Sequence, residues 1–246
     1  MDRLLPAPAM LETGPDTGLG DTLAEQYAYP AGLTAPYVRV NFVSSVDGAV
    51  TVDGRSGGLG SAADRRVFGV LRELCDVVLV GAGTARAEDY RGARKPTRGR
   101  DTPPPVAVVT GSAGVSPKSR LLTDTAVPPI VFTLRTAPAE RLEALADAGA
   151  EVVPLDRLAP EVLLAELGRR GLYRVLCEGG PMLHGQLQAA DAVDELCLTL
   201  SPLLAGGDSG RISRGSAGAP PRPMTLVHAL HEDGTLLLRY ARAAGR

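Results

Sequence analysis

The chain contains no tryptophan, only three cysteines and no long apolar run. Cys75, Cys177 and Cys197 each stand alone in apolar stretches, without a C-x-x-C pair or a histidine at ligand spacing. We therefore expect buried thiols in a reducing cytoplasm, and we predict no metal site. The apolar runs are too short to span a bilayer, and the first residues lack a basic segment followed by an apolar core, so neither membrane insertion nor export is expected.

The chain also lacks an excess of charge of either sign. Its 26 Lys and Arg residues nearly balance 28 Asp and Glu residues, which gives a net charge of −2. This balance provides no field for nonspecific nucleic-acid binding and favours a small-molecule partner. With 246 residues, of which 44% are hydrophobic, the chain can bury a large core. We predict one domain over residues 36–246, preceded by an extension over residues 1–35.

Strands and helices are predicted to alternate along the domain. Apolar strands are expected at 37–43, 77–80, 106–110, 130–133, 151–154, 175–177 and 195–200, followed by a hairpin of 225–230 and 235–240. Helices are expected from a Ser61 cap and over 138–149, 160–170 and 182–190. This order predicts an α/β fold with a mostly parallel sheet, flanking helices and antiparallel C-terminal strands.

Two glycine turns follow buried strands. Cys177 leads into Glu178-Gly179-Gly180-Pro181, and Val80 leads into Gly81-Ala82-Gly83-Thr84. Glycine lets a ligand approach the backbone, Pro181 suits a first helical turn, and free helix N–H groups attract phosphate. One such turn could be merely a tight connection, but the carboxyl ends of neighbouring strands share a crevice, so the pair indicates an anion site. Neither turn completes a G-x-G-x-x-G or P-loop pattern, which disfavours a standard Rossmann or nucleoside-triphosphate site.

Three motifs then stand in a characteristic order. They are Asn41 with Ser45-x-Asp47-Gly48, the Gly81 turn with Ala87-Glu88-Asp89, and Glu178-Gly179-Gly180-Pro181 with Val193-Asp194-Glu195-Leu196. Together they resemble the reductase domain of the bifunctional riboflavin-biosynthesis deaminase/reductase, over about residues 37–239. The resemblance implies a dihydrofolate-reductase-like three-layer fold with helices on both faces of the sheet. It also implies NADPH-dependent reduction of a ribosylamino-pyrimidine phosphate, such as 5-amino-6-(5-phosphoribosylamino)uracil, by a homodimer.

The resemblance implies roles for individual residues. The cofactor would contact Gly81, Ala82, Gly83 and Thr84, a third polar turn of Thr110, Gly111 and Ser112, and the segment Glu178, Gly179, Gly180, Pro181, Met182 and Leu183. The substrate would contact Asn41, Ser61, Arg72, Asp89 and one of Arg94 or Lys95. Glu178 and Asp47 are the catalytic candidates. Alternatives remain open, since Glu178 could be a structural acceptor, Asp47 could build an Asx turn, and the basic residues of 86–100 could form a solvated loop.

Two departures from the family pattern affect the substrate prediction. Residues 56–61 contain no aromatic ring, and the sequence contains no H-x-E with P-C-x-x-C of a deaminase domain. The substrate could therefore be the riboflavin intermediate, a related pyrimidine or a pteridine. Dihydrofolate reductases hold a pterin with an acidic residue on the helix after the first loop, and the corresponding predicted helix carries Asp64 near its start, with no direction predicted for its side chain. A protein that binds NADPH but has lost the riboflavin-pathway substrate, and a module without enzymatic activity, are the further alternatives.

Overall fold

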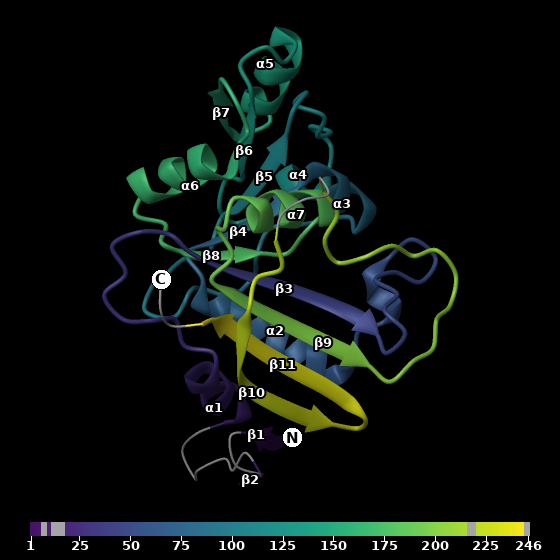
Figure 1. Cartoon of the computed structure of the whole chain (residues 1–246). Coiled ribbons are helices and arrows are strands. Elements are labelled where there is room, and N and C mark those ends of the chain that lie inside the picture. The colour runs from purple at the N-terminus through teal and green to yellow at the C-terminus, as the bar shows by residue number, and fades with distance from the viewer. Residues whose placement is uncertain (6–8, 11–17, 216–219, 244–246) are drawn as a thin grey trace.

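A computed structural model describes residues 1–5, 9–10, 18–215 and 220–243. These residues form an α/β fold around one sheet of eleven strands in the order β2-β1-β10-β11-β9-β3-β8-β4-β5-β6-β7 (Figure 1). The run from β9 to β7 is parallel, and the other pairs are antiparallel. The predicted fold class is therefore confirmed.

Most strands lie within a residue or two of their predicted positions. The parallel strands are β3 Tyr37–Ser45, β4 Val77–Gly81, β5 Val106–Thr110, β6 Ile130–Leu134, β7 Glu151–Leu155, β8 Arg174–Cys177 and β9 Glu195–Ser201. The antiparallel part adds β1 Asp2–Leu5, β2 Ala9–Met10, β10 Met224–Glu232 and β11 Thr235–Arg242.

Helices cover both faces of the sheet. They are α1 Leu19–Gln26, α2 Ala62–Leu74, α3 Ala82–Ala87, α4 Arg120–Thr123, α5 Ala139–Asp147, α6 Pro160–Arg169 and α7 Pro181–Ala189, with a short 3-10 turn η1 at Ser56–Gly58. Alternate strand residues separate two cores: Val78 packs with α1 to α5, and Leu79 packs with α6 and α7. The segment from Gly81, predicted as a glycine turn, is the N-cap and first turn of α3, a helix that was not predicted.

Residues before Tyr37 contribute to the sheet and to one core. Asp2 and Arg3 pair with His231 and Leu230 of β10. Helix α1 packs against α2, and its Leu23 is fully buried. The boundary at residue 36 stays a prediction, but the described part of residues 1–35 packs against the domain rather than standing away from it.

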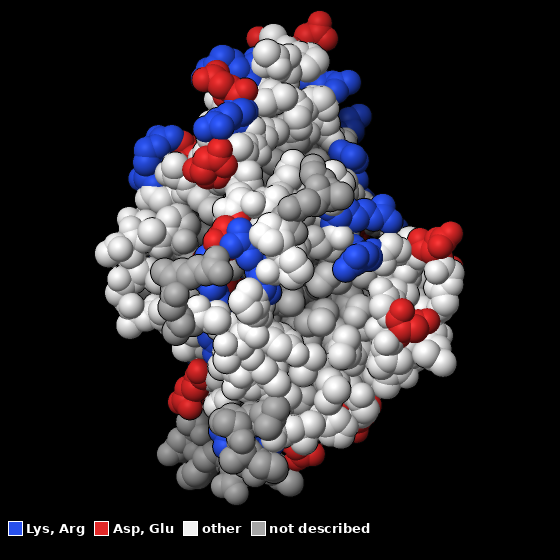
Figure 2. All heavy atoms as spheres, viewed as in Figure 1, with Lys and Arg blue, Asp and Glu red and all other residues white. Residues whose placement is uncertain are grey.

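One sheet face, over β9 and β11, is not covered by any helix of the described residues. Leu198 pairs with Leu238, and the flanking Leu196–Tyr240 and Leu200–Leu236 pairs point to the same side. These side chains are partly exposed in strands whose alternate residues are mostly buried. Figure 2 shows mostly uncharged atoms over this area, which we call the β9–β11 face.

A buried ion-pair cluster joins β3, β9 and β11. The Glu195 side chain is fully buried; its Oε1 lies 2.5 Å from Arg39 Nε and its Oε2 lies 2.9 Å from Arg239 Nη2. Burial raises the pKa of Glu195, but the charge of Arg39, together with the charge and hydrogen bond of Arg239, outweighs burial and lowers the pKa below its ordinary value. The cluster therefore contributes stability only while Glu195 is ionised.

None of the helices in the described ranges combines the length and apolar character needed to cross a bilayer.

We expect Glu195→Gln to reduce the free energy of unfolding by about 3–5 kcal/mol, because it leaves buried Arg39 without a counter-charge. Urea unfolding at neutral pH measures the loss. Since the folded-state pKa of Glu195 is lowered, the difference from wild type should narrow as pH falls through that lowered pKa. Glu161→Gln is the control, because its pair with Arg157 is exposed and should contribute about 0.5 kcal/mol or less. Equal losses in the two variants would contradict the prediction.

Candidate functional site

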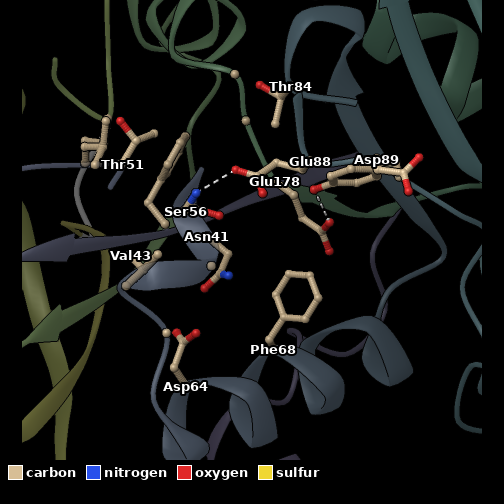
Figure 3. Close-up of a pocket in the computed structure, with 18 of the residues that line it drawn as sticks. Asn41, Val43, Thr51, Ser56, Asp64, Phe68, Thr84, Glu88, Asp89 and Glu178 are labelled. Carbon is tan, nitrogen blue, oxygen red and sulfur yellow. Dashed lines mark hydrogen bonds between the residues drawn. The ribbon is translucent and has the colours of Figure 1, made fainter. Parts of the chain in front are cut away.

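The principal pocket lies at the carboxyl ends of β4 and β8, beside β3 and α2. Its volume is about 600 Å³. Glu178 and Thr84 approach it from the ends of the two strands, while Asn41 and Phe68 point into it from β3 and α2 (Figure 3). The pocket thus lies where the sequence predicts a ligand crevice.

The two glycine turns contact each other beside this pocket. The Gly81 N–H donates to the Gly179 carbonyl at 2.8 Å. Gly179 has a φ of +104°, and a Cβ on Gly180 would lie 2.5 Å from Thr84 Oγ1. Gly81 and Gly180 are the N-cap residues of α3 and α7, and neither glycine can offer a side-chain cap. Pro181 has no N–H, so the N–H groups that follow it in the first turn of α7 are the ones that an anionic ligand can use.

Glu178 is held by three donors at the edge of the pocket. Arg72 binds it in bidentate fashion, with Nε–Oε1 at 2.7 Å and Nη2–Oε2 at 2.6 Å. The Tyr90 hydroxyl donates to Oε2 at 2.8 Å (Figure 3). Burial lowers the pKa of Arg72, but the charge and hydrogen bonds of Glu178 outweigh burial and raise it. Burial, followed by the Glu178 charge, raises the pKa of Tyr90 well above its ordinary value. The carboxylate thus has a fixed orientation.

Three further carboxylates, those of Asp64, Glu88 and Asp89, line the pocket. Asp64, at the start of α2, accepts a hydrogen bond of 2.7 Å from the Thr199 hydroxyl. Burial raises the pKa of Asp64, and the Thr199 hydrogen bond offsets only part of that rise. Glu88, just after α3, accepts the Ser56 N–H at 2.7 Å (Figure 3). Asp64 thus presents an acceptor to the pocket, whereas Glu88 attaches η1 to the end of α3.

The predicted substrate residues divide into two groups. Asn41, Arg72 and Asp89 line the pocket, and Asp89 pairs with Arg120 at 3.1 Å. Ser61, in contrast, is not in the pocket lining. It is the α2 N-cap, and its hydroxyl accepts the N–H of Asp64, so the predicted cap forms.

Arg94 and Lys95 also lie away from the pocket lining. Arg94 pairs with Asp124 at 2.5 Å, and Lys95 pairs with Glu73 at 2.7 Å. The structure does not bring these two predicted phosphate ligands to the pocket, because carboxylates outside its lining hold both cations.

Asp47 is likewise placed outside the pocket. Its carboxylate accepts the Ser45 hydroxyl and the N–H groups of Ala205 and Gly206. These hydrogen bonds lower the pKa of Asp47 to about 2. Asp47 is exposed, stays ionised at neutral pH and already accepts hydrogen bonds from the loop at Ala205 and Gly206. Such a carboxylate is poorly suited to donate a proton, so the geometry does not support the predicted catalytic role.

The predicted cofactor residues are likewise only partly brought together. Thr84, Glu178, Gly179, Gly180 and Pro181 line the pocket. Gly81 donates its N–H to the Gly179 carbonyl, Gly83 and Met182 are exposed, and Ala82 and Leu183 belong to the cores.

The Thr110 turn lies apart from the pocket lining. The Thr110 hydroxyl accepts the Gly114 N–H at 3.0 Å. Arg86 and Arg141 reach the same turn, where Arg86 donates to the Gly114 carbonyl and Arg141 donates to the Ser112 carbonyl at 3.1 Å. Gly111 lies between these contacts, in the turn that follows β5.

Several lining residues were not predicted from the sequence. Three aromatic rings, those of Phe42, Phe68 and Tyr90, border the pocket and supply the aromatic surface that residues 56–61 lack. Arg91 and Arg120 also line it. Phe68 occupies the polar side of the predicted helical pattern, so its position could have been found; the pocket position of Arg120, on the unpredicted α4, had no sequence signal. Within the described ranges, no cluster of three or more His, Cys, Asp or Glu residues suits a metal ion.

Comparison with known proteins agrees with this geometry. The sequence matches the RibD C-terminal domain over residues 36–237. The chain belongs to this family. It is 32% identical over 218 residues to the 2,5-diamino-6-ribosylamino-4(3H)-pyrimidinone 5′-phosphate reductase of Archaeoglobus fulgidus, covering 84% of this chain and 99% of that one. It is 31% identical over 178 residues to the enzyme of the same name from Methanothermobacter thermautotrophicus, covering 72% and 82%.

A solved structure supports the same assignment. The pyrimidine reductase-like protein of Corynebacterium diphtheriae is 25% identical and superposes with a TM-score of 0.77, covering 90% of this chain and 99% of that one. The predicted family is therefore confirmed, and the chain is an oxidoreductase of the pyrimidine reductase type.

We expect Gly180→Ala to destabilise the fold by about 1–3 kcal/mol, because the added Cβ collides with Thr84 Oγ1. The double variant Thr84→Ala/Gly180→Ala removes that oxygen and should recover most of the loss. Urea unfolding of wild type, the two single variants and the double variant gives the coupling free energy between positions 84 and 180. Strictly additive losses would mean that the turns do not meet as described.

Proposed function

We propose that this chain is an NADPH-dependent reductase of a ribosylamino-pyrimidine 5′-phosphate, opening the ribose to a ribityl chain. The observation that carries the proposal is the pocket at the paired glycine turns, bordered by the fixed Glu178–Arg72 pair. When bound, NADPH would supply the hydride. The names of the relatives from A. fulgidus and M. thermautotrophicus agree with a substrate of this class.

The residues present fit such a cofactor. The N-terminus of α7 offers backbone donors to a pyrophosphate, and Gly180 keeps that approach free of a Cβ that Thr84 could not accommodate. At the Thr110 turn, the exposed Arg86 and Arg141 supply positive charge that would suit a 2′-phosphate. This charge supports NADPH rather than NADH.

Glu178 would place negative charge at the nicotinamide end of the pocket. Because Arg72 and Tyr90 both donate to it, its orientation is set before any ligand binds. A side chain that is already oriented loses little entropy in the transition state. This supports the catalytic assignment of Glu178, in the sense of placing charge rather than transferring a proton.

Arg91 and Arg120 are the candidates for holding the substrate phosphate. Both line the pocket. Arg120 is shared between Asp89 and Asp124, whereas Arg91 forms no hydrogen bond or ion pair within the part of the chain that the structure describes. A phosphate would supply the counter-charge that Arg91 lacks among those residues. We therefore assign to Arg91 the role predicted for Arg94 or Lys95.

Asp64 would contact the base. A carboxylate accepts N–H donors, and a 2-amino-4-pyrimidinone edge offers two of them, the 2-amino group and N3–H. A uracil ring presents a carbonyl at the same corner, which a carboxylate repels. Asp64 therefore favours the diamino-pyrimidinone substrate over its deaminated counterpart. Because pterins share this edge, a pteridine reductase is the second candidate.

We further propose that the protein acts in the cytoplasm as a homodimer. The three cysteines are buried free thiols, which suits a reducing compartment. Among the described residues, the β9–β11 face has neither a covering helix nor charge over much of its area, and a second copy would bury it symmetrically.

The test of the function is NADPH oxidation with a panel of acceptors. We expect turnover with the diamino-pyrimidinone substrate, less with the deaminated uracil form, and tighter binding of NADPH than of NADH in a fluorescence titration. Turnover of dihydrofolate or pterins alone would reject the riboflavin-type assignment. Failure to bind either nicotinamide cofactor would reject the reductase proposal as a whole.

Arg91→Gln and Arg94→Gln form a matched pair for the phosphate site. We expect Arg91→Gln to raise KM for the phosphorylated substrate by about tenfold or more, the loss of one charge-assisted contact. Arg94→Gln, whose side chain pairs outside the pocket, should leave KM nearly unchanged. KM for the dephosphorylated substrate should be the same in the two variants. An equal rise in both would place the phosphate elsewhere.

The dimer is tested by sedimentation of wild type and Leu198→Lys. A species of twice the chain mass is expected for wild type. The lysine places a charge at the centre of the β9–β11 face and should give a monomer, while Glu161→Gln should not. A monomeric wild type at micromolar concentration would refute the proposed dimer.

A further inference from the structure

Residues 205–214 run from the loop after β3 to helix α7, and we call them the strap; among them, Ile212 lines the principal pocket. One end is attached to the loop after β3. Asp47 accepts the N–H groups of Ala205 at 3.1 Å and of Gly206 at 2.8 Å, and the Val50 N–H donates to Ser209 Oγ at 3.2 Å. This first attachment is independent of α7.

The other end of the strap is attached to α7. His184 Nδ1 lies 3.1 Å from the Ile212 carbonyl oxygen. The Arg214 N–H donates to the Pro181 carbonyl at 2.9 Å, and the Ser213 hydroxyl donates to Gln188 Oε1 at 2.8 Å. Three hydrogen bonds therefore hold residues 212–214 along the helix, from Pro181 in its first turn to Gln188 in its last.

The strap and α7 are in unusually close backbone contact at Gly185. A Cβ on this residue would lie 1.8 Å from the Arg214 carbonyl oxygen. Any larger residue at position 185 would therefore displace the strap or the helix. The helical position of Gly185 is explained by this approach rather than by helix propensity.

His184 links the strap to a second pocket wall. Its ring stacks on Phe42, with centroids 4.9 Å apart and an angle of 23° between the rings. Phe42 and Ile212 both line the principal pocket, whereas His184 does not. Burial lowers the pKa of His184, so the ring is neutral near neutral pH, and a neutral ring must carry its proton on Nδ1 to donate to the Ile212 carbonyl.

We infer that His184 is a positioning residue that sets the pocket wall formed by Ile212 and Phe42, and that Asp47 holds the opposite end of the strap. His184 and Asp47 act through the strap, without touching substrate. The inference rests on the proposed function for what the pocket binds, but the attachment of the strap can be measured without any substrate.

The experiment combines hydrogen exchange with steady-state kinetics. His184→Phe keeps a ring against Phe42 and removes the donor to Ile212, whereas His184→Asn keeps a donor near the Nδ1 position. In His184→Phe we expect faster exchange across residues 205–214, by about tenfold or more, as for an opened local segment. KM for the acceptor should rise by about tenfold, with kcat and NADPH affinity changed by less than about threefold. His184→Asn should bring both the exchange rates and KM back most of the way to the wild-type values.

Gly185→Ala displaces the strap by a different route and should reproduce the exchange and KM changes. Gly69→Ala is its matched control, because a Cβ added to this glycine of α2 would meet no heavy atom within 4 Å. Asp47→Ala should speed exchange at Ala205 and Gly206.

Two results would overturn the inference. Unchanged exchange in His184→Phe would show that His184 does not hold the strap. Faster exchange with an unchanged KM would show that the strap does not form a wall of the acceptor site. A wild type that binds NADPH yet reduces no acceptor on the panel would reject the proposed function alone, because the exchange comparison would still decide whether His184 holds the strap.

Discussion

The contact between two glycine turns is the constraint on which the site depends. The Gly81 N–H reaches the Gly179 carbonyl, and Gly180 lies against Thr84 with no room for a side chain. Because these residues end the neighbouring strands β4 and β8, the contact fixes where α3 and α7 begin. It also brings Glu178 to the edge of the pocket, where Arg72 on α2 can reach it. One backbone approach thus joins three helices and two strands into a single site.

Several charged side chains of the pocket form ion pairs with one another. Glu178 is matched by Arg72, and Asp89 is matched by Arg120. Such pairs hold their side chains, and the charges these carry, in fixed positions. Arg91, which forms no ion pair among the described residues, and the acceptor Asp64 are among the lining groups outside these pairs, and we assign to them the recognition of phosphate and base. In this proposal, residues outside the ion pairs recognise the substrate, while the paired residues maintain the shape of the site.

The fold could be predicted largely from local patterns. Continuous apolar runs marked β4 and β5 to within a residue, and the Ser61 cap marked the start of α2. Helix α3 was missed because its Gly-rich start has low helix propensity, and tertiary contact overrides that preference. The site was less predictable because a side chain's partner lies far away in sequence. The sequence around Lys95 does not indicate that Glu73 pairs with it. Likewise, the sequence around Asp47 does not indicate that the Ala205 N–H donates to its carboxylate.

The pairing of β1 with β10 has a consequence for how the chain reaches this structure. Asp2 pairs with His231, so β1 finds its partner only after more than two hundred further residues have been added to the chain. During synthesis, β3 to β8 can associate first, while one edge of β3 stays unpaired until β9 has been made. Pairings of such high sequence separation form slowly and leave strand edges open in the meantime. The antiparallel half is thus the part of the sheet for which the newly made chain depends most on protection from aggregation.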